Sequence, residues 1–175
     1  REPMERPTPT DVEHEVTSVD MIVSKSDEKG NITYTNPIFM KISGYTQGEL
    51  LDQPHSILRH PDMPKVIFKY LWDNIQAGKD VNAYVKNLCK DGGFYWVLAQ
   101  VRVAKNPDGS FRNYVSTRKN ITPAVKDTIS KLYAKLLEVE KSDGVDASEK
   151  VLMDFLAENG QSAETFNDFM MQLNK

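Results

Sequence analysis

Prolines divide residues 36–64 into pieces too short for a long helix, and this stretch limits most strongly what the chain can fold into. The segment NPIFMKISGYTQGELLDQPHSILRHPDMP contains four prolines but remains rich in apolar side chains. Because proline removes a backbone N–H and clashes with the preceding turn, only short helices fit between the prolines. Short apolar helical turns beside a sheet commonly enclose a small-molecule pocket, and we predict that this stretch forms the wall of one.

Two short helices are predicted at the start of this stretch. Asn36 is a typical N-cap, Pro37 suits the first helical position and Gly44 suits the end of the helix. Thr46 followed by Glu49 has the pattern of a capping box, which predicts a second short helix. The turns that follow carry four polar residues with functional potential: His55, Arg59, His60 and Asp62.

Alternating apolar residues and turn sequences outside this stretch predict five β-strands. The strands are expected at residues 22–25, 32–35, 81–90, 94–104 and 111–118. The sequences DEKGN, KDGG and NPDG supply the glycines and aspartates that tight turns require. A helix over residues 65–77, with apolar residues at helical spacing, separates the second strand from the third. This order predicts an α+β fold, a five-stranded antiparallel sheet with short helices on one face.

Three further helices are predicted after the last strand, over residues 122–175. The first runs from Thr122 to about Lys141, and its apolar residues alternate spacings of four and three, which is a heptad seam. The seam residues are Val125, Ile129, Leu132, Leu136 and Val139. The seam spans only about two heptads, fewer than a coiled coil normally needs. Asp146 and Ser162 are expected to cap two shorter amphipathic helices, which must pack on each other, on the sheet or on a partner.

The first 19 residues differ from the rest in carrying three prolines and alternating charges. We expect residues 1–19 to be an extended or disordered extension, or a cap over the domain that follows. Val12 and Val16 lie four residues apart, so a short cap helix is an alternative. His14 falls within this segment and is expected to be solvated.

Composition and the absence of motifs exclude several classes of function. The net charge of −3 gives no drive toward nucleic acid. Cys89 is the single cysteine, so an internal disulfide is impossible and a reducing, cytoplasmic location is expected. No apolar run reaches the length of a membrane span. The sequence has no serine nucleophile elbow, Cys–His pair, Walker loop or zinc-ligand spacing, so we expect neither an enzyme nor a metal centre.

Several motifs together resemble a known family. The pattern GYT-x-x-EL-x-x-QPH is present as GYTQGELLDQPH at residues 44–55, and RHPDMP follows at residues 59–64. The likeness continues through LWDNIQAGK, VKNLCKDGGFYWV and YVSTRKNIT. Over residues 20–122 the chain is therefore similar to a PAS domain of the aerotaxis-receptor (Aer) type. The resemblance implies a PAS fold, with a sensor domain over residues 20–121 and a C-terminal helical extension over residues 122–175.

The resemblance also implies a flavin, FAD, as the cofactor, because in this family the RHPDMP motif lies at the FAD site. The residues implied to approach the flavin are Arg59, His60, Asp62, Trp72 and Asn87, with Asn36 as a further candidate. Arg59 and His60 offer donors to an anionic or carbonyl group. Asn87 alternates inward with Val85 and Cys89 on its strand, and its amide provides both the donor and the acceptor that a flavin ring edge requires.

Local structural roles are the alternative for the same residues. Arg59 and Asp62 can form an ion pair with each other, and Asp62 can cap the helix that begins after Pro64. Cys89 is expected to be a small core residue. A light-sensing thiol is not expected, because that PAS subclass carries its cysteine in the helical segment, where this chain has HSILRH.

Two other states of the pocket remain open. Haem is the rival cofactor, with His55 or His60 as the iron ligand. Aer-type domains carry a pattern like GxPW before the VKN strand. This chain has GKDVN there, with Val81 where an aromatic residue is expected, so the aromatic wall beside a flavin is missing at this position. In the third state the pocket holds no cofactor and is filled by side chains, namely Phe39, Leu58 and Trp72.

We therefore expect a signal-sensing protein that detects oxygen or redox state in a chemotaxis-type pathway. A redox change would alter the hydrogen bonds between the flavin and Asn87, and the last strand would pass the change to the helix that begins at Thr122. We expect a homodimer, and a signalling partner that contacts the C-terminal helices. A ligand-free PAS module for dimerisation or docking, and a haem-based gas sensor, are the alternatives.

Overall fold

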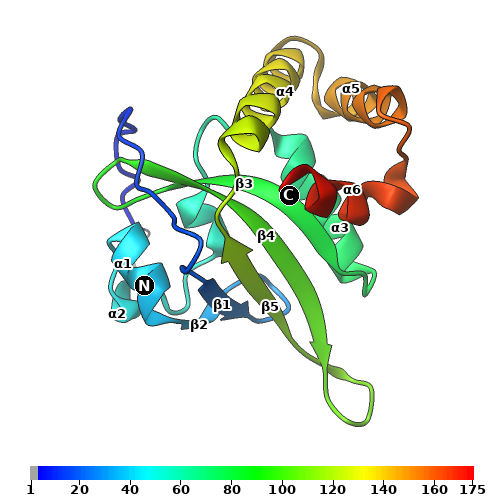
Figure 1. The fold of residues 1–175 in the computed structure, drawn as a ribbon. Coiled ribbons are helices and arrows are strands. Elements are labelled where there is room, and N and C mark those ends of the chain that lie inside the picture. The colour runs from blue at the N-terminus through cyan, green and yellow to red at the C-terminus, as the bar shows by residue number, and fades with distance from the viewer. Residues whose placement is uncertain (1–3) are drawn as a thin grey trace.

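The computed structural model describes residues 4–175, which form a five-stranded antiparallel sheet with helices on both faces (Figure 1). The strands are β1 (Ile22–Ser26), β2 (Ile32–Thr35), β3 (Val81–Leu88), β4 (Phe94–Lys105) and β5 (Phe111–Lys119). Their order across the sheet is β2-β1-β5-β4-β3, and every neighbouring pair is antiparallel. The predicted α+β architecture is confirmed.

The proline-broken stretch and the helix after it lie on one face of the sheet, which we call the inner face. They form α1 (Pro37–Ser43), α2 (Gln47–Leu50), the 3₁₀ helix η1 (His55–Leu58) and α3 (Lys65–Gln76). The Asn36 side chain accepts a hydrogen bond from the Phe39 N–H at 3.1 Å, and Gly44 ends α1 in the left-handed conformation. Thr46 and Glu49 form the predicted capping box. The local helix signals of this stretch are therefore confirmed.

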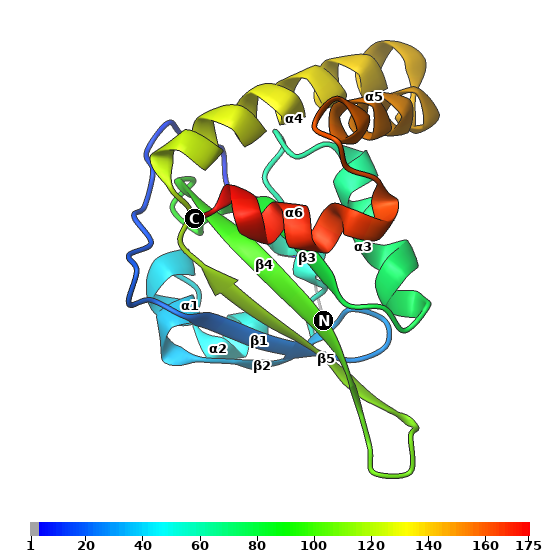
Figure 2. The same cartoon turned by 45° about the vertical axis from the view of Figure 1, so that its right-hand side comes forward.

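The C-terminal helices lie on the opposite face of β3 and β4, which we call the outer face. They are α4 (Pro123–Asp143), α5 (Val145–Glu158) and α6 (Phe166–Leu173), with the 3₁₀ turn η2 (Ala163–Thr165) before α6. Helix α6 packs on β3, whereas α4 and α5 stack on each other and reach α3 (Figure 2). None of the helices within residues 4–175 combines the length and the apolar character that a bilayer crossing requires.

The heptad seam of α4 is buried inside the chain's own structure. Val125 and Leu136 are at most 3 % exposed and belong to the same core as the outer-face residues of the sheet. The Tyr133 ring lies 5.9 Å from the Trp96 ring, measured between centroids, and its hydroxyl donates to the Tyr84 carbonyl at 2.7 Å. The seam therefore holds α4 on the sheet, and the homodimer stays a prediction.

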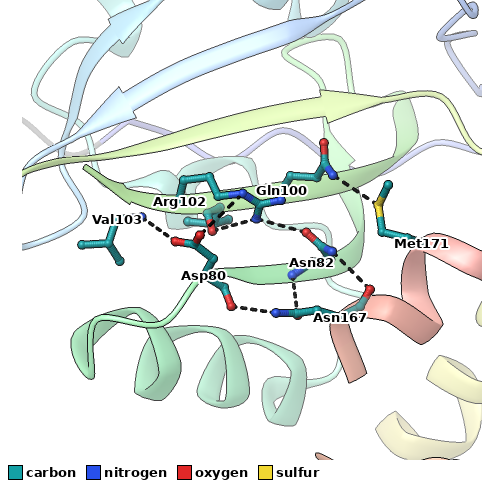
Figure 3. A network of polar contacts seen from close by, with 8 residues as sticks. Asp80, Asn82, Gln100, Arg102, Val103, Asn167 and Met171 are labelled. Atoms are coloured by element: carbon teal, nitrogen blue, oxygen red, sulfur yellow. Dashed lines mark hydrogen bonds and ion pairs between the residues drawn. The ribbon is translucent and has the colours of Figure 1, made fainter. Parts of the chain in front are cut away.

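A network of polar contacts fastens α6 to the edge strand β3 (Figure 3). The Asn167 side chain accepts from the backbone N–H of Asn82 at 2.9 Å and donates to the carbonyl of Asp80 at 2.8 Å. On β4, Arg102 donates to Asn82 Oδ1 at 3.1 Å, and its Nε lies 3.8 Å from Asp80 Oδ2. An edge strand exposes unpaired backbone groups. The Asn167 amide satisfies the N–H of Asn82 on this strand and the carbonyl of Asp80 just before it, and so covers the start of the edge.

The C-terminal helices also cap the helix that walls the predicted pocket. The Glu140 carboxylate of α4 accepts hydrogen bonds from the first two backbone N–H groups of α3, at 2.7 and 3.0 Å. The prediction that Asp62 caps this helix, or pairs with Arg59, is wrong, because Asp62 pairs with Lys86 Nζ at 2.9 Å. A proline precedes α3 and provides no side-chain acceptor, so the acceptor comes from a distant part of the chain.

The described part of the N-terminal segment is extended, and the alternative of a short cap helix is wrong. It runs beside the β3–β4 hairpin, where the His14 N–H donates to the Phe94 carbonyl at 2.7 Å and the Phe94 N–H donates to the Val12 carbonyl at 3.0 Å. His14 is also not simply solvated, because its Nε2 lies 2.8 Å from Asp91 Oδ2. Backbone pairing with the hairpin thus replaces helical hydrogen bonds in this segment.

The two predicted caps in the C-terminal part differ in outcome. Ser162 forms a capping box with Thr165 at the start of η2, which leads directly into α6. The prediction for Asp146 is wrong, because α5 begins directly after Gly144 and places Asp146 inside its first turn. Gly144 adopts a positive φ of 89°, which few other residues tolerate, and lets the chain reverse tightly between α4 and α5.

Candidate functional site

A cavity of about 270 Å³ lies between the inner face of the sheet and the helices η1 and α3. Side chains of β1, β3, β4 and β5 form the sheet side of the cavity, and η1, α3 and the β1–β2 turn form the rest. The apolar part of the helical wall consists of Leu58, Phe68, Leu71, Trp72 and Ile75. Small-molecule sites in proteins begin at about 300 Å³. Leu58 and Trp72 therefore line a hollow of nearly that size instead of filling it.

Buried polar atoms without partners face this cavity. They are Arg59 Nε, Ser116 Oγ and one terminal guanidinium nitrogen of Arg118, and all three residues line the hollow. Leaving a buried donor or acceptor unsatisfied costs about 1–3 kcal/mol, and more when the group is charged. Such atoms gathered around one hollow indicate a place where a ligand completes the hydrogen bonding.

Arg118 is a deeply buried cation on β5. Its guanidinium donates to Ser24 Oγ at 3.0 Å and lies 5.2 Å from the centroid of the Phe39 ring. Burial lowers the pKa of this guanidinium, since the charged form loses its hydration. None of the described residues that line the cavity is acidic, so no carboxylate of the wall balances this charge. The site therefore favours a ligand with anionic or carbonyl oxygen atoms.

Arg59 bounds the cavity directly after η1. Its guanidinium carbon lies 3.7 Å from the centroid of the Phe68 ring, and burial lowers the pKa of the group. The backbone of Arg59 forms an antiparallel bridge with Asn87, which joins this wall to β3. From outside, the Arg6 guanidinium donates to the carbonyls of Ser56 and Arg59. The N-terminal segment thus helps to hold this wall in place.

Asn87 and Trp72 face the cavity from the sheet and from α3, respectively. Asn87 is 5 % exposed, and its amide donates to the Tyr95 hydroxyl at 3.2 Å. The Trp72 ring meets the Tyr114 ring edge-on at 6.1 Å between centroids. A Cβ atom at Gly30 would lie 3.7 Å from the Trp72 ring, so the β1–β2 turn packs directly against the indole. The cavity is thereby closed on this side by an aromatic face.

His55 lines the cavity as a neutral imidazole. Its removal from water, and secondarily the positive charge of Arg118, lower the pKa of His55 to about 3. The Ser24 hydroxyl lies 3.2 Å from His55 Nε2 while also accepting from Arg118. The hydroxyl keeps a second lone pair, so the tautomer of His55 sets whether Ser24 or His55 Nε2 donates in this contact. A haem iron would have to displace Ser24 to bind this nitrogen.

Three of the predicted flavin contacts lie outside this cavity. His60 is 4 % exposed, its Nδ1 accepts from the Asp62 N–H at 3.0 Å, and its ring meets Phe94 edge-on. The Asp62 side chain is held by Lys86. Asn36 caps α1 and also binds the backbone of β1. These residues support the wall of the cavity, whereas the predicted residues Arg59, Trp72 and Asn87 line it. A direct contact of the first three with a flavin stays a prediction.

Arg118, Ser24 and Ser116 line the cavity without having been expected from the sequence. A signal for Arg118 exists, because it follows Tyr114 and Ser116 at alternate positions of β5 and so shares their inward face. An arginine at an inward strand position is rarely buried unless it is paired or functional. Strand alternation alone would therefore have identified it.

The donor set of the cavity fits a flavin ring. One edge of that ring carries carbonyl oxygens and nitrogens, and its faces are apolar. The sheet side of the cavity offers the Arg118 guanidinium, the Ser116 hydroxyl and the Asn87 amide, and α3 offers aliphatic and aromatic side chains. The unpaired atoms of Arg118 and Arg59 are donors, which such acceptors would satisfy.

Comparison with known proteins agrees with this architecture. The PAS fold family matches residues 32–118. The aerotaxis receptor of Escherichia coli (strain K12) is 37 % identical over 115 residues, which are 66 % of this chain and 22 % of the receptor. The nitrogen fixation regulatory protein of Klebsiella pneumoniae is 26 % identical over 149 residues, which are 81 % of this chain and 30 % of that protein. The chain thus spans less than a third of the length of either relative.

Solved structures show the same fold. A light-oxygen-voltage domain studied with a flavin analogue superposes with a TM-score of 0.55 at 20 % identity, over 69 % of this chain and 87 % of that domain. The light state of the blue-light photoreceptor Aureochrome1 superposes with a TM-score of 0.53 at 23 % identity, over 69 % of this chain and 89 % of that one. From its motifs, its fold and its relatives, the chain belongs to the PAS fold family, and its PAS domain is of the aerotaxis-receptor type.

Proposed function

We propose that this chain is a signal-sensing module that binds a flavin in the inner-face cavity and reports the state of that flavin through its C-terminal helices. The names of its relatives, an aerotaxis receptor and a nitrogen fixation regulatory protein, support a sensing role. Oxygen or redox state is the proposed stimulus. The proposed receiver of the signal is a chemotaxis-type pathway in the cytoplasm. The module acts by contact and not as an enzyme.

One observation carries the proposal, namely that unpaired buried donors surround a hollow. Arg59 and Arg118 each keep a guanidinium nitrogen without a partner, and the Ser116 hydroxyl beside them is also unpaired. A domain that needed only a packed core would be more stable with apolar side chains at these positions. Two cations kept beside a cavity therefore support the proposal of a ligand whose acceptor atoms receive hydrogen bonds from their unpaired nitrogens.

The residues of the cavity have separate roles in holding the ligand. Trp72 and Leu71 of α3 cover the hollow and exclude water from it. Arg118 and Asn87 present donors from the sheet, and the Arg118 guanidinium favours a negatively charged ring edge. A bound flavin supplies reversible electron and proton transfer. Arg118 and Ser116 would hold the polar edge of a bound ring from β5, so a change in the charge of that ring would act on this strand.

FAD is the proposed form of the cofactor. A cavity of about 270 Å³ accommodates one ring system, so the nucleotide part of FAD has to lie outside it. Lys29 on the β1–β2 turn and Arg59 after η1 both border the hollow. Their cationic groups would suit the diphosphate of FAD.

Helix α3 connects the cavity to the C-terminal helices. One side of α3 places Leu71 and Trp72 in the cavity wall. On another side, the Tyr70 ring packs against Phe166 at 4.5 Å between centroids, and Glu140 caps the helix from α4. A shift of α3 that follows the state of the ligand therefore changes the packing of α4 and α6. The size of that shift is limited by the difference in affinity between the two states.

The proposed output is a contact made by the C-terminal helices. The exposed sides of α4–α6 meet a signalling partner, and a second copy of the chain forms the proposed homodimer. Because the seam of α4 is buried on the sheet, with Leu136 fully covered, a dimer through that seam requires α4 to detach first. Release of α4 would then be the signalling event.

An absorption spectrum of the natively purified protein tests the proposal. We expect flavin bands, and denaturation should release FAD in a ratio of one per chain. Arg118→Met should abolish the bands, because it removes the main donor of the cavity. Arg102→Met on β4 is the matched control, since Arg102 faces away from the cavity and binds Asn82; this variant should retain the flavin.

Three other results would each reject a flavin bound in this cavity. A haem Soret band that His55→Gln removes would identify a gas sensor. Protein that stays colourless after incubation with FAD, FMN and haemin would support a ligand-free docking module. Flavin that binds equally well to Arg118→Met and to the parent protein would place the cofactor outside this cavity.

A further inference from the structure

A second cluster of reactive side chains lies away from the flavin cavity, at the β3–β4 hairpin. His14 of the N-terminal segment faces Asp91 in the hairpin turn, with 2.8 Å between His14 Nε2 and Asp91 Oδ2. Cys89 follows β3 directly, and the ligating atoms of the three residues all lie within 4.8 Å of one another. The three side chains line one surface hollow together with Glu15 and Lys41.

The hairpin is built so that the N-terminal segment can approach it closely. A Cβ atom at Gly93 would lie 2.6 Å from His14 Nε2, and a Cβ atom at Gly92 would lie 2.2 Å from the Thr8 carbonyl oxygen. Both distances are shorter than a real side chain permits, so only glycines fit these positions. The backbone of His14 is also hydrogen-bonded to Phe94. The meeting of His14 with the hairpin is therefore fixed by the backbone.

We propose that His14, Cys89 and Asp91 bind one divalent transition-metal ion, for which Zn²⁺ is the best match. Imidazole, thiolate and carboxylate groups are the ligands that zinc takes in proteins. Tetrahedral bonds of about 2.0–2.3 Å place ligand atoms roughly 3.3–3.8 Å apart. His14 Nε2 and Asp91 Oδ2, now 2.8 Å apart, need to separate only slightly. Glu15, which lines the same hollow, or a water molecule completes the coordination.

The charges around the cluster suit a divalent cation. Binding breaks the S–H bond of Cys89, forms a sulfur–metal bond and releases the proton to solvent. The thiolate and the Asp91 carboxylate then supply two negative charges. Lys90 beside them is already paired with Glu49 at 2.8 Å, which offsets its charge. Lys41, which lines the same hollow, makes no such ion pair among the described contacts.

The ion would link the N-terminal segment to the wall of the flavin cavity. Cys89 lies two residues after Asn87 on the same stretch of chain, and Asn87 lines that cavity. Arg6, in the same segment as His14, donates to the carbonyl of Arg59 in the cavity wall. No sequence spacing reveals the cluster, because His14 lies far from the other two ligands along the chain.

Titration of untagged, chelator-treated protein with Co²⁺ tests the proposal, because a thiolate-to-cobalt charge-transfer band reports a cysteine ligand directly. We expect one Co²⁺ per chain, with this band, and its loss when Zn²⁺ is added. Cys89→Ser should remove the band, and His14→Gln and Asp91→Asn should each weaken binding by at least about tenfold. Asp108→Asn is the matched control, because Asp108 accepts from a backbone N–H two residues later in its own hairpin turn, as Asp91 does.

A parent protein without the thiolate band, or His14→Gln and Asp91→Asn variants that bind Co²⁺ like the parent, would overturn the proposal. Both variants change partly exposed side chains, so they decide the question even where Cys89→Ser does not fold. Difference spectra separate the cobalt bands from those of a flavin. A chain that takes up Co²⁺ but no flavin would retain the metal site while rejecting the proposed sensor.

Discussion

The two faces of the sheet show how one set of strands serves two purposes. On the outer face, no described residue of β3, β4 or α4–α6 has a buried side-chain nitrogen or oxygen without a partner, although Asn113 Oδ1 on β5 is unpaired. On the inner face, the same strands border a cavity where Arg59, Ser116 and Arg118 keep unpaired atoms. The outer face is organised for stability, and the inner face gives up stability to keep a binding site open.

The difference follows from the residues that alternate along β4. Ala99 and Val101 point inward and line the cavity. Their small side chains leave space above the sheet. Trp96 and Leu98 point outward, where they are 7 % and 0 % exposed under the C-terminal helices. Protein cores pack to a nearly constant density, so an unfilled inner face next to a filled outer face is a specific feature of this strand.

The largest expected effect comes from removing the same leucine volume on each side of this contrast. Leu136 of α4 is fully buried, whereas Leu71 of α3 lines the cavity. Leu136→Ala should lower the free energy of unfolding by about 2–5 kcal/mol, because it opens a new hole in a filled core. Leu71→Ala enlarges an existing hollow, so its cost should stay below about 1.5 kcal/mol. Urea denaturation measures the free energy of unfolding of both variants. Equal losses would mean that the inner face is packed as tightly as the outer face.

The second test compares two arginines on adjacent strands. In ligand-free protein, Arg118→Met should raise the free energy of unfolding by about 1–3 kcal/mol, because it removes a buried cation with an unpaired nitrogen. Arg102→Met should lower it by about 0.5–1.5 kcal/mol, because Arg102 loses its contacts with Asn82 and Asp80. Thermal and urea unfolding report both signs. A loss of stability in Arg118→Met would mean that this arginine is structural.

The sequence predicts the inner-face architecture well, because its signals are local. Asn36, Pro37 and Gly44 define α1 within one short window, and Thr46 with Glu49 defines α2. Strand alternation places Asn87 on the inner face, as the structure shows. Each of these features depends on neighbours a few residues away, so the chain needs no tertiary information to specify them.

The features that the sequence does not predict depend on distant contacts. The cap of α3 comes from Glu140, because the residue before α3 is a proline. The motif residues His60 and Asp62 lie beside the cavity and not in it, since Lys86 on β3 draws Asp62 away. The approach of His14 to the hairpin requires the extended course of the N-terminal segment. None of these pairings can be recognised from the spacing of residues that are close together in the sequence.

A pH series tests the neutral histidine of the cavity wall. His55 has a pKa of about 3 in the folded chain and about 6.5 when unfolded, so below pH 6.5 the unfolded state binds the extra proton. The free energy of unfolding should therefore fall as the pH drops from 6.5 toward 3, by up to about 1.4 kcal/mol per pH unit. His55→Gln should flatten this slope between pH 6.5 and 5. His60, whose pKa burial also lowers, should leave a residual slope of the same sign.

The smallest expected effect concerns the contact that joins the two faces. The Glu140 carboxylate accepts two N–H groups at the start of α3 and one hydrogen bond from Ser148 Oγ. Glu140→Gln keeps one acceptor oxygen but loses the charge that favours a helix N-terminus, so it should cost about 0.5–1 kcal/mol.

Glu138→Gln on the same helix is the matched control for Glu140→Gln, because Glu138 is exposed and makes no ion pair among those described. It should change stability by less than about 0.5 kcal/mol. Hydrogen exchange at the backbone N–H groups of Lys65 and Val66 should speed up in Glu140→Gln and not in Glu138→Gln. If both variants leave that exchange unchanged, α4 does not control the start of α3. A change in the cavity then cannot reach the C-terminal helices through this end of α3.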